Sequence, residues 1–353
     1  MKWNRQIRNS AMASMLALPL VLSGCSLFGT SPSKQIDPPP ADIEAQMMQS
    51  TGSVDQTSLA VGAEVSTVYL QNAHGLLAPV SLHLPQGDAT AKTMAALEAL
   101  VSEGAYAKLI PAEFKGVLPK GTEVKAVTLK PDEKLAVVEF NKEFSNYSAA
   151  DERKIAEALT WTLVDNPEIQ NVQLWMDGAK LNEMPVAGMP LDRPLNRSLG
   201  INLQLDRETN LSQSSPVTIF FSAATEEGTA YFVPVTRFVP YGSDLVAAAI
   251  DEMIKGPIKG DGLENVLTQN TLLDGVERSD NGVVTVSIKD DMFEPGEKLP
   301  AQMMQSLVLT ISENAAQDKV RIWLNGEKDV LGTDNQNYGQ PVMRPQGIND
   351  IPL

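Results

Sequence analysis

The spacing of hydrophobic residues alternates along the chain between strand-like and helix-like patterns, which predicts a mixed fold. Residues 65–71 and 78–84 are short runs of the kind that forms β-strands. Residues 90–103 then carry hydrophobic side chains at helical spacing, and Gly104 is expected to end this helix. The opening pattern is therefore a strand pair followed by a helix.

A second group of elements follows. Residues 124–130 and 135–141 flank a Pro-Asp-Glu segment and predict a β-hairpin. Ser148 is expected to cap a second helix. Residues 172–176 then alternate as a strand does, and an Asp-Gly pair predicts a tight hairpin turn after them.

The strongest internal feature is a repeat. The segment VQLWMDGAK in the first half of the chain matches VRIWLNGEK in the second half without a gap. The match pairs Trp175 with Trp323 and, in the predicted hairpin turns, Gly178 with Gly326. We take these four residues as markers of the repeat. Each tryptophan is expected to pack against the second helix of its own copy.

Further matches keep the same order along the chain. Residues 79–85 match residues 234–240, and Gly-Ile-Asn recurs at 200–202 and 347–349. A Pro-x-x-Arg-Pro tail also recurs, and its alignment pairs Gly188, Pro190, Arg193 and Pro194 with Gly339, Pro341, Arg344 and Pro345. Repeats of this length indicate a duplicated domain rather than a solenoid. We assign the two copies to residues 65–202 and 216–353, joined by a linker at 203–215.

Each copy is predicted to be a small α+β domain with an antiparallel sheet and two helices. In the second copy, Ser243 is expected to cap a helix over residues 245–255, and Gly256 is expected to end it. Residues 283–288 predict a strand in that copy. Hairpin signals inside each copy distinguish this plan from the parallel lobes of solute-binding proteins.

The first 24 residues have the pattern of a bacterial lipoprotein signal peptide. Lys2, Arg5 and Arg8 precede a hydrophobic stretch that is too short for a comfortable membrane span. Leu-Ser-Gly-Cys then resembles the site where such proteins are cut and lipid-modified. We expect residues 1–24 to be removed and Cys25 to carry the lipid, which would hold the protein on the extracytoplasmic face of the cell membrane.

Residues 25–64 are predicted to be a flexible, lipid-anchored tether. This segment contains a Pro-Pro-Pro run and many small polar residues. Such a composition buries too little apolar surface to fold. We therefore interpret it as a spacer that holds the two domains away from the membrane.

Composition narrows the classes of partner. Hydrophobic residues make up 43% of the chain, enough for two folded cores. The formal net charge is −16, which repels nucleic acid, so no nucleic-acid partner is expected. Cys25 is the only cysteine, which excludes an intrachain disulfide.

Candidate catalytic and metal chemistry is sparse. His74 and His83 are the only histidines, and no third ligand for zinc is evident near them. Glu143 and Asp291 occupy corresponding loops, but their neighbours are polar, unlike those of a catalytic acid with a raised pKa. We predict no catalytic, cofactor-binding or metal-binding residues. Two alternatives stay open: a lipoprotein that modifies or binds peptidoglycan, and a solute-binding lipoprotein.

The lipid-anchor motif, the tether and the two copies, each with a tryptophan hairpin and a Pro-x-x-Arg-Pro tail, resemble the GerM family of sporulation and spore germination lipoproteins. The resemblance implies a non-enzymatic envelope protein without a cofactor. It also implies a place on the mother-cell membrane, facing the space between mother cell and forespore. Protein partners in the channel complex that joins the two cells follow from the same resemblance, as does a domain similar to ring-building modules. Free sheet edges leave self-association open.

Overall fold

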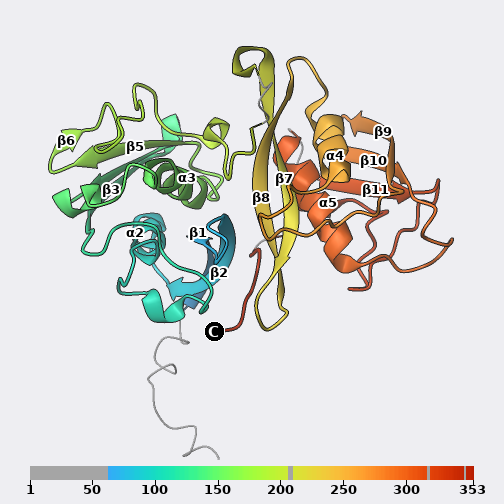
Figure 1. The fold of residues 1–353 in the computed structure, drawn as a ribbon, viewed down its shortest axis with the longest axis horizontal. Helices are drawn as coiled ribbons and strands as arrows, with labels where there is room; N and C mark the ends of the chain where they lie inside the picture. The colour runs from blue at the N-terminus through green and yellow to red at the C-terminus, as the bar shows by residue number, and fades with distance from the viewer. Residues whose placement is uncertain (1–62, 206–209, 316–318, 346) are drawn as a thin grey trace, which may run out of the picture. The chain divides into compact units, whose positions relative to one another are not determined.

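The computed structural model describes residues 63–205, 210–315, 319–345 and 347–353. These described residues belong to one compact unit, whose elements are shown in Figure 1. The expected signal peptide, Cys25 and the expected tether up to residue 62 lie outside the described residues. We call residues 63–202 the first domain and residues 214–353 the second domain.

The first domain contains two sheets and two α-helices. Its two-stranded sheet pairs β1 (Ala63–Gln71) with β2 (Leu77–Pro85) in antiparallel register. Its second sheet has the order β3-β4-β5-β6. These strands are Val124–Lys130, Leu135–Phe140, Asn171–Met176 and Ala179–Lys180. The helices are α2 (Ala89–Ala99) and α3 (Glu152–Leu163), and short 3-10 turns lie at Ala107–Leu109, Pro131–Glu133, Lys142–Ser145 and Arg197–Leu199.

The second domain repeats this plan. A 3-10 turn at Leu211–Gln213 leads into β7 (Ser214–Ala224), which pairs with β8 (Ala230–Pro240). The four-stranded sheet has the order β12-β11-β10-β9. Its strands are Leu272–Ser279 (β9), Val283–Lys289 (β10), Lys319–Leu324 (β11) and Val342–Met343 (β12), and its helices are Leu245–Lys255 (α4) and Ala301–Asn314 (α5). The prediction of two tandem α+β domains with two helices each is confirmed.

Each four-stranded sheet is mixed rather than purely antiparallel as expected. The strands β4 and β5 run parallel, and so do β10 and β11. Parallel neighbours need a crossover connection, and the second helix of each domain, α3 or α5, forms that crossover. The hairpins predicted from the sequence are present, but the crossover adds one parallel pair per domain.

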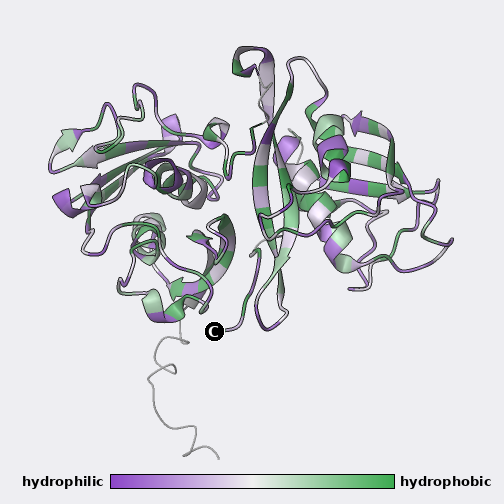
Figure 2. Cartoon of the chain, viewed as in Figure 1, coloured by the Kyte–Doolittle hydropathy of each residue, from purple (hydrophilic) through white to green (hydrophobic). Residues whose placement is uncertain are grey.

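Hydrophobic faces meet between the layers of each domain. In the second domain, α4 and α5 lie between the β7–β8 pair and the larger sheet (Figure 1). The buried face of α5 includes Met303, Leu307 and Ile311, and that of α3 includes Ile155 and Leu159. Figure 2 shows hydrophobic and hydrophilic residues alternating along the strands, as expected when a sheet has only one face against a core.

Both predicted serine caps are wrong. Ser148 lies before the helix, and its hydroxyl donates to a carboxylate oxygen of Asp151 at 2.7 Å. Asp244, not Ser243, caps α4, because its carboxylate accepts from the backbone N–H groups of Val246 and Ala247. In both places an aspartate next to the helix start takes the position that the sequence pattern assigned to serine.

The two tryptophan hairpins occupy equivalent positions. Trp175 lies beside Glu139 on β4, and Trp323 lies beside Ser287 on β10, at the same register of the two sheets. In the turns that follow, Gly178 and Gly326 have φ values of 80° and 83°. The residue before each glycine also has positive φ, which is the geometry of a type I′ turn.

The expectation that these tryptophans pack against the second helix is wrong. Side chains alternate along a strand, and on β5 and β11 the helix-facing positions belong to neighbours such as Leu174 and Ile322. Trp175 and Trp323 are half-buried on the opposite face of each sheet. The Trp175 indole N–H donates to Gln173, while the Lys328 ammonium lies 4.6 Å from the centre of the Trp323 ring.

Among the residues that the structure describes, no helix has the length and apolar character needed to cross a membrane.

Candidate functional site

The first Gly-Ile-Asn segment joins the two domains through one side chain. The Asn202 amide nitrogen donates to the Leu77 carbonyl in its own domain and to the Pro234 carbonyl in the second domain, both at 2.7 Å. The Asn202 side-chain oxygen accepts from the Leu77 backbone N–H at 2.8 Å. A single amide therefore binds the edge of β2 and the edge of β8 together.

The second Gly-Ile-Asn segment makes the same contacts in the opposite direction. The Asn349 amide nitrogen donates to the Phe232 carbonyl in its own domain and to the Pro79 carbonyl in the first domain, both at 2.7 Å. The Asn349 side-chain oxygen accepts from the Phe232 backbone N–H at 2.7 Å. Because Pro79 and Pro234 are matched positions of the repeat, the two contacts are related by approximate two-fold symmetry.

The backbone explains why the motif contains glycine and asparagine. Gly200 and Gly347 have φ values of 75° and 77°, and Asn202 and Asn349 have values of 47° and 60°. Glycine adopts this left-handed region freely, and asparagine is among the few other residues that tolerate it. A Cβ atom on Gly200 would also lie 3.2 Å from the Cβ of Thr236, so the chain approaches the other domain closely at this point.

The middle residues of each motif bind the second strand of the opposite domain. Thr236 donates its backbone N–H to the Ile201 carbonyl, and its hydroxyl accepts from the Ile201 N–H, both at 2.9 Å. Ser81, the matched residue in β2, donates its hydroxyl to the Ile348 carbonyl at 2.9 Å and its N–H to the Asn349 carbonyl at 3.2 Å. We call the two Gly-Ile-Asn segments, together with β2 and β8, the clasp.

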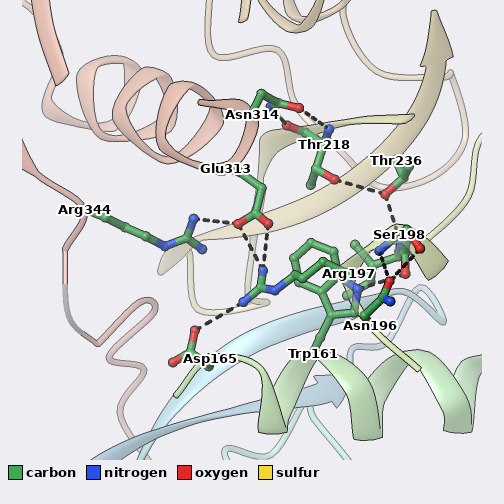
Figure 3. A network of polar contacts seen from close by, with 12 residues as sticks. Trp161, Asp165, Asn196, Arg197, Ser198, Thr218, Thr236, Glu313, Asn314 and Arg344 are labelled. Atoms are coloured by element: carbon green, nitrogen blue, oxygen red, sulfur yellow. Dashed lines mark hydrogen bonds and ion pairs between the residues drawn. The ribbon is translucent and has the colours of Figure 1, made fainter. Parts of the chain in front are cut away.

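Four charged side chains lie beside the clasp (Figure 3). Arg197 of the first domain contacts both carboxylate oxygens of Glu313 in the second domain, at 2.9 and 3.0 Å. Arg344 contacts the same carboxylate at 2.7 Å, and Asp165 lies 3.8 Å from Arg197. Two arginines and two carboxylates balance each other, so the cluster has no formal net charge when all four are ionised.

The arginines also stack on aromatic rings. The Arg197 guanidinium lies 4.0 Å from the centre of the Trp161 ring, and Arg344 lies 5.3 Å from that of Phe220. Trp161 is fully buried, and its indole N–H donates to the Gly200 carbonyl at 2.8 Å. Stacking of this kind adds to the charge attraction and fixes the guanidinium planes. The core of the first domain is thereby linked to the clasp.

Burial and charge have opposite effects on the two carboxylates. Burial alone would raise the pKa of Glu313, but the nearby Arg197 and Arg344 outweigh it and hold that pKa below its usual value. Burial raises the pKa of Asp165, and Arg197 only partly offsets this effect. Glu313 is therefore the carboxylate on which the cross-domain ion pair depends.

The structure corrects the alignment of the two C-terminal tails. Val172 pairs with Leu195, and its repeat counterpart Val320 pairs with Val342. Arg197 therefore corresponds to Arg344, whereas the Pro-x-x-Arg-Pro comparison matched Arg193 to it. The correct alignment has no gap and was readable from the sequence, since PLNRSLGIN at 194–202 matches PVMRPQGIN at 341–349.

The candidate catalytic residues are not brought together. His74, His83 and Asp291 are exposed, and Glu143 is half-buried. Within residues 63–205, 210–315, 319–345 and 347–353, no group of three or more potential ligands could hold a metal ion. A surface hollow of about 560 Å³ is lined by Asn270, Leu272, Lys289, Asp290, Asp291 and Asn325. In that hollow, the Asp290 carboxylate already accepts from the hydroxyls of Thr268 and Thr271.

A family profile described as sporulation and spore germination matches residues 67–182 and 218–330, one segment in each domain. The chain belongs to the GerM family. The spore germination protein GerM of Bacillus subtilis (strain 168) is 32% identical over 360 residues, and the match covers 96% of both chains. This chain is thus a GerM homologue, in a family associated with sporulation and germination.

A solved GerM structure shares the two-domain fold. The tandem GerMN domains of the sporulation protein GerM from Bacillus subtilis have a TM-score of 0.75 and 32% identity. That match covers 82% of this chain and 99% of the solved chain. The matched segments of the family profile end before both Gly-Ile-Asn motifs. The two Gly-Ile-Asn segments of the clasp therefore lie outside the matched segments, whereas β2 and β8 lie within them.

Proposed function

We propose that this GerM-family chain is a non-enzymatic assembly module of a sporulation envelope complex. It is anchored through a lipid at Cys25 on the extracytoplasmic face of the membrane, and it acts between mother cell and forespore. Its partners are proteins of the channel complex that joins the two cells. Family membership supports the setting, and the geometry of the two domains supports the assembly role.

The clasp is the observation that carries this proposal. Asn202 and Asn349 bind across the domain boundary in both directions, and Arg197 adds an ion pair to Glu313. Two domains held in this way present their outer surfaces at a fixed spacing. A partner that contacts both domains avoids the entropy loss of ordering them, which is the advantage of preorganisation in binding.

Surfaces suited to protein partners remain outside the clasp. Among the described residues, β3 and β9 pair with a neighbouring strand on one side only, so each leaves a sheet edge for strand addition. Trp175 and Trp323 are half-buried on the outer faces of the same sheets. Aromatic residues are enriched in protein interfaces, which favours these two faces over the more polar surface.

The net charge and the tether determine which partners the chain favours and how strongly a second contact forms. With a net charge of −16, the chain favours partners that present basic surfaces, and such association weakens as salt rises. A flexible tether on a lipid anchor keeps the domains near the membrane while they reach partners. A second contact then benefits from a high effective concentration.

The test compares matched variants in sporulating cells. A strain that lacks the chain is complemented with the wild type, with Arg197→Glu or with Arg193→Glu, and crosslinked partners are identified. The wild type and Arg193→Glu are expected to restore sporulation and capture the same envelope proteins, because Arg193 is exposed and lies outside the clasp. Arg197→Glu is expected to lose capture. Full sporulation without the chain, together with release of muropeptides by the purified protein, would overturn the proposal in favour of a wall-modifying enzyme.

A further inference from the structure

The clasp is built from two faces that each carry both halves of the asparagine contact, the side-chain amide and the proline carbonyl that accepts from it. The second domain supplies Asn349 as a donor and the Pro234 carbonyl as the acceptor of the matching amide. It also supplies the Thr236 hydroxyl and N–H, and the Ile348 carbonyl that a matching hydroxyl contacts. In this structure, each of these groups forms a hydrogen bond with a group of the first domain.

Each domain also carries one arginine and one carboxylate in the charged cluster. Glu313 and Arg344 both belong to the second domain, and Asp165 and Arg197 hold the matched positions in the first. Two copies of the second domain brought together by the same two-fold relation would again place two arginines beside two carboxylates. An interface in which the same patch occurs on both partners is isologous, and such a patch is self-complementary.

The buried residues behind the charged cluster differ between the two domains. Phe220 and Leu309 of the second domain stand where the first domain has Tyr69 and Trp161. A pair of second domains therefore has smaller side chains behind the charged cluster than a pair of first domains. The stacking of Arg344 on Phe220 lies within one domain and is retained.

We propose that the clasp face of the second domain is a docking surface for the same face of a second copy of this chain. In the intact chain, the first domain occupies this face, because the short linker gives it a high effective concentration. When the first domain is displaced, two second domains pair through their Gly-Ile-Asn segments. The inference does not depend on the role in sporulation, since it concerns only the recognition surface.

The test uses the full mature chain with Cys25→Ser, so that no lipid contributes to association. Arg197→Glu places a carboxylate against Glu313 and opens the clasp from the first-domain side. We expect its mass in solution to change from monomer to dimer at micromolar concentration, whereas the wild type and Arg193→Glu stay monomeric. Adding Arg344→Glu to Arg197→Glu removes the cation that the second copy needs, and is expected to restore the monomer.

A second measurement covers the case in which Arg197→Glu fails to fold. A protease site replaces residues 206–209 in a chain that carries Asn202→Ala, which weakens the clasp only from the first-domain side. The chain is cut, and a tagged preparation is mixed with an untagged one. Untagged second domain is expected to copurify with tagged second domain, and Arg344→Glu is expected to abolish this. A folded Arg197→Glu chain whose two domains have separated, as limited proteolysis and small-angle scattering would show, but which stays monomeric would overturn the proposal. So would a dimer that survives Arg344→Glu, or a lack of exchange between second domains in the cut protein.

Discussion

Asn202 and Asn349 make the same three side-chain hydrogen bonds, two to their own domain and one to a proline carbonyl of the other domain. Each asparagine thus forms two hydrogen bonds with the second strand of its own domain and one with the second strand of the other domain. This reciprocity ties the duplication in the sequence to a physical consequence, because the repeated motif is what holds the two copies together.

Removing either asparagine should destabilise the protein by a similar amount. Asn202→Ala or Asn349→Ala leaves two carbonyls and one N–H without their partner, and we expect a loss of about 2–4 kcal/mol in the free energy of unfolding. Denaturant unfolding provides the measurement. Asn270→Ala is the matched control, because Asn270 is exposed and its side chain donates only to the exposed Asp291 carboxylate. A clearly smaller effect at one of the two clasp positions would contradict the reciprocal contact.

Gly200 should be sensitive to a single added methyl group. Gly200→Ala imposes a left-handed backbone on alanine and brings the new Cβ to 3.1 Å from the Thr236 Cγ2 in the other domain and to 2.7 Å from the Leu203 Cδ2, which can rotate away. Gly228→Ala is the control, because Gly228 has a φ of 86° but nothing within 4 Å of an added Cβ. We expect Gly200→Ala to be the more destabilising by about 1–3 kcal/mol, measured by thermal or denaturant unfolding. Equal effects would show that the close approach between domains costs nothing.

The contribution of Glu313 should depend on pH in a defined direction. Its pKa is lowered in the folded protein, since Arg197 and Arg344 outweigh the effect of burial. The stability that it provides is therefore fully present above its unfolded pKa of about 4.3. That stability is lost as pH falls through the lower folded value.

The measurement is the difference in Tm between the wild type and Glu313→Gln. We expect it to be the same at pH 7 and at about pH 5.5, and to shrink only at pH values below about 4. Asp165→Asn is the contrasting variant, because burial raises the pKa of Asp165 and ionising it opposes folding. A Glu313→Gln difference that vanishes between pH 7 and pH 5.5 would contradict the assigned pair.

The tryptophans should divide into two classes. Trp161 is fully buried beneath Arg197, so Trp161→Ala should cost about 3–5 kcal/mol. Trp175 and Trp323 are half-buried on outer sheet faces, so truncating either should cost about 1 kcal/mol or less. In cells, Trp175→Ala and Trp323→Ala should reduce the crosslinking of partner proteins although they barely change stability. Folded Trp175→Ala and Trp323→Ala proteins that bind all partners normally would remove these faces from the proposed function.

The lipid anchor is tested at Cys25. Cys25→Ser removes the thiol that receives the lipid, and we expect the variant either to be released from the membrane or to accumulate as an uncut precursor. Cell fractionation and metabolic labelling with a fatty acid measure the outcome. A variant that is cut to the mature length and stays tightly bound to the membrane would refute the anchor.

Much of the fold could be predicted because local patterns and the structure agree. The hydrophobic spacing located the strands and helices of the first domain, although α2 ends at Ala99 rather than at Gly104, and it located α4 and β10 in the second. The Asp-Gly and Asn-Gly turns have the backbone that these residues favour. Parallel pairing of β4 with β5 was missed, because local hairpin signals carry no information about a crossover. The orientation of Trp175 was missed because a large aromatic residue suggested burial, while strand alternation placed Leu174 inward instead.

The sequence predicts the repeated motif of the clasp but not its contacts. Gly-Ile-Asn recurs in the sequence, yet its role depends on contacts with strands far away in the chain, such as Asn349 with Pro79. The match of Arg193 to Arg344 obscured Arg197, although the gapless match of residues 194–202 to 341–349 was available. Charge complementarity between Arg197 and Glu313 is a tertiary property, so no local pattern could predict it.

The central claim is that the clasp, not the linker, holds the two domains together as one body. The most direct measurement replaces residues 206–209 with a protease site, cuts the chain completely and determines the mass by gel filtration with light scattering at physiological salt. The account predicts that the cut protein keeps the mass of the intact chain, and that the halves separate when Asn202→Ala and Asn349→Ala are combined. Separation of the wild-type halves after cutting would contradict the account.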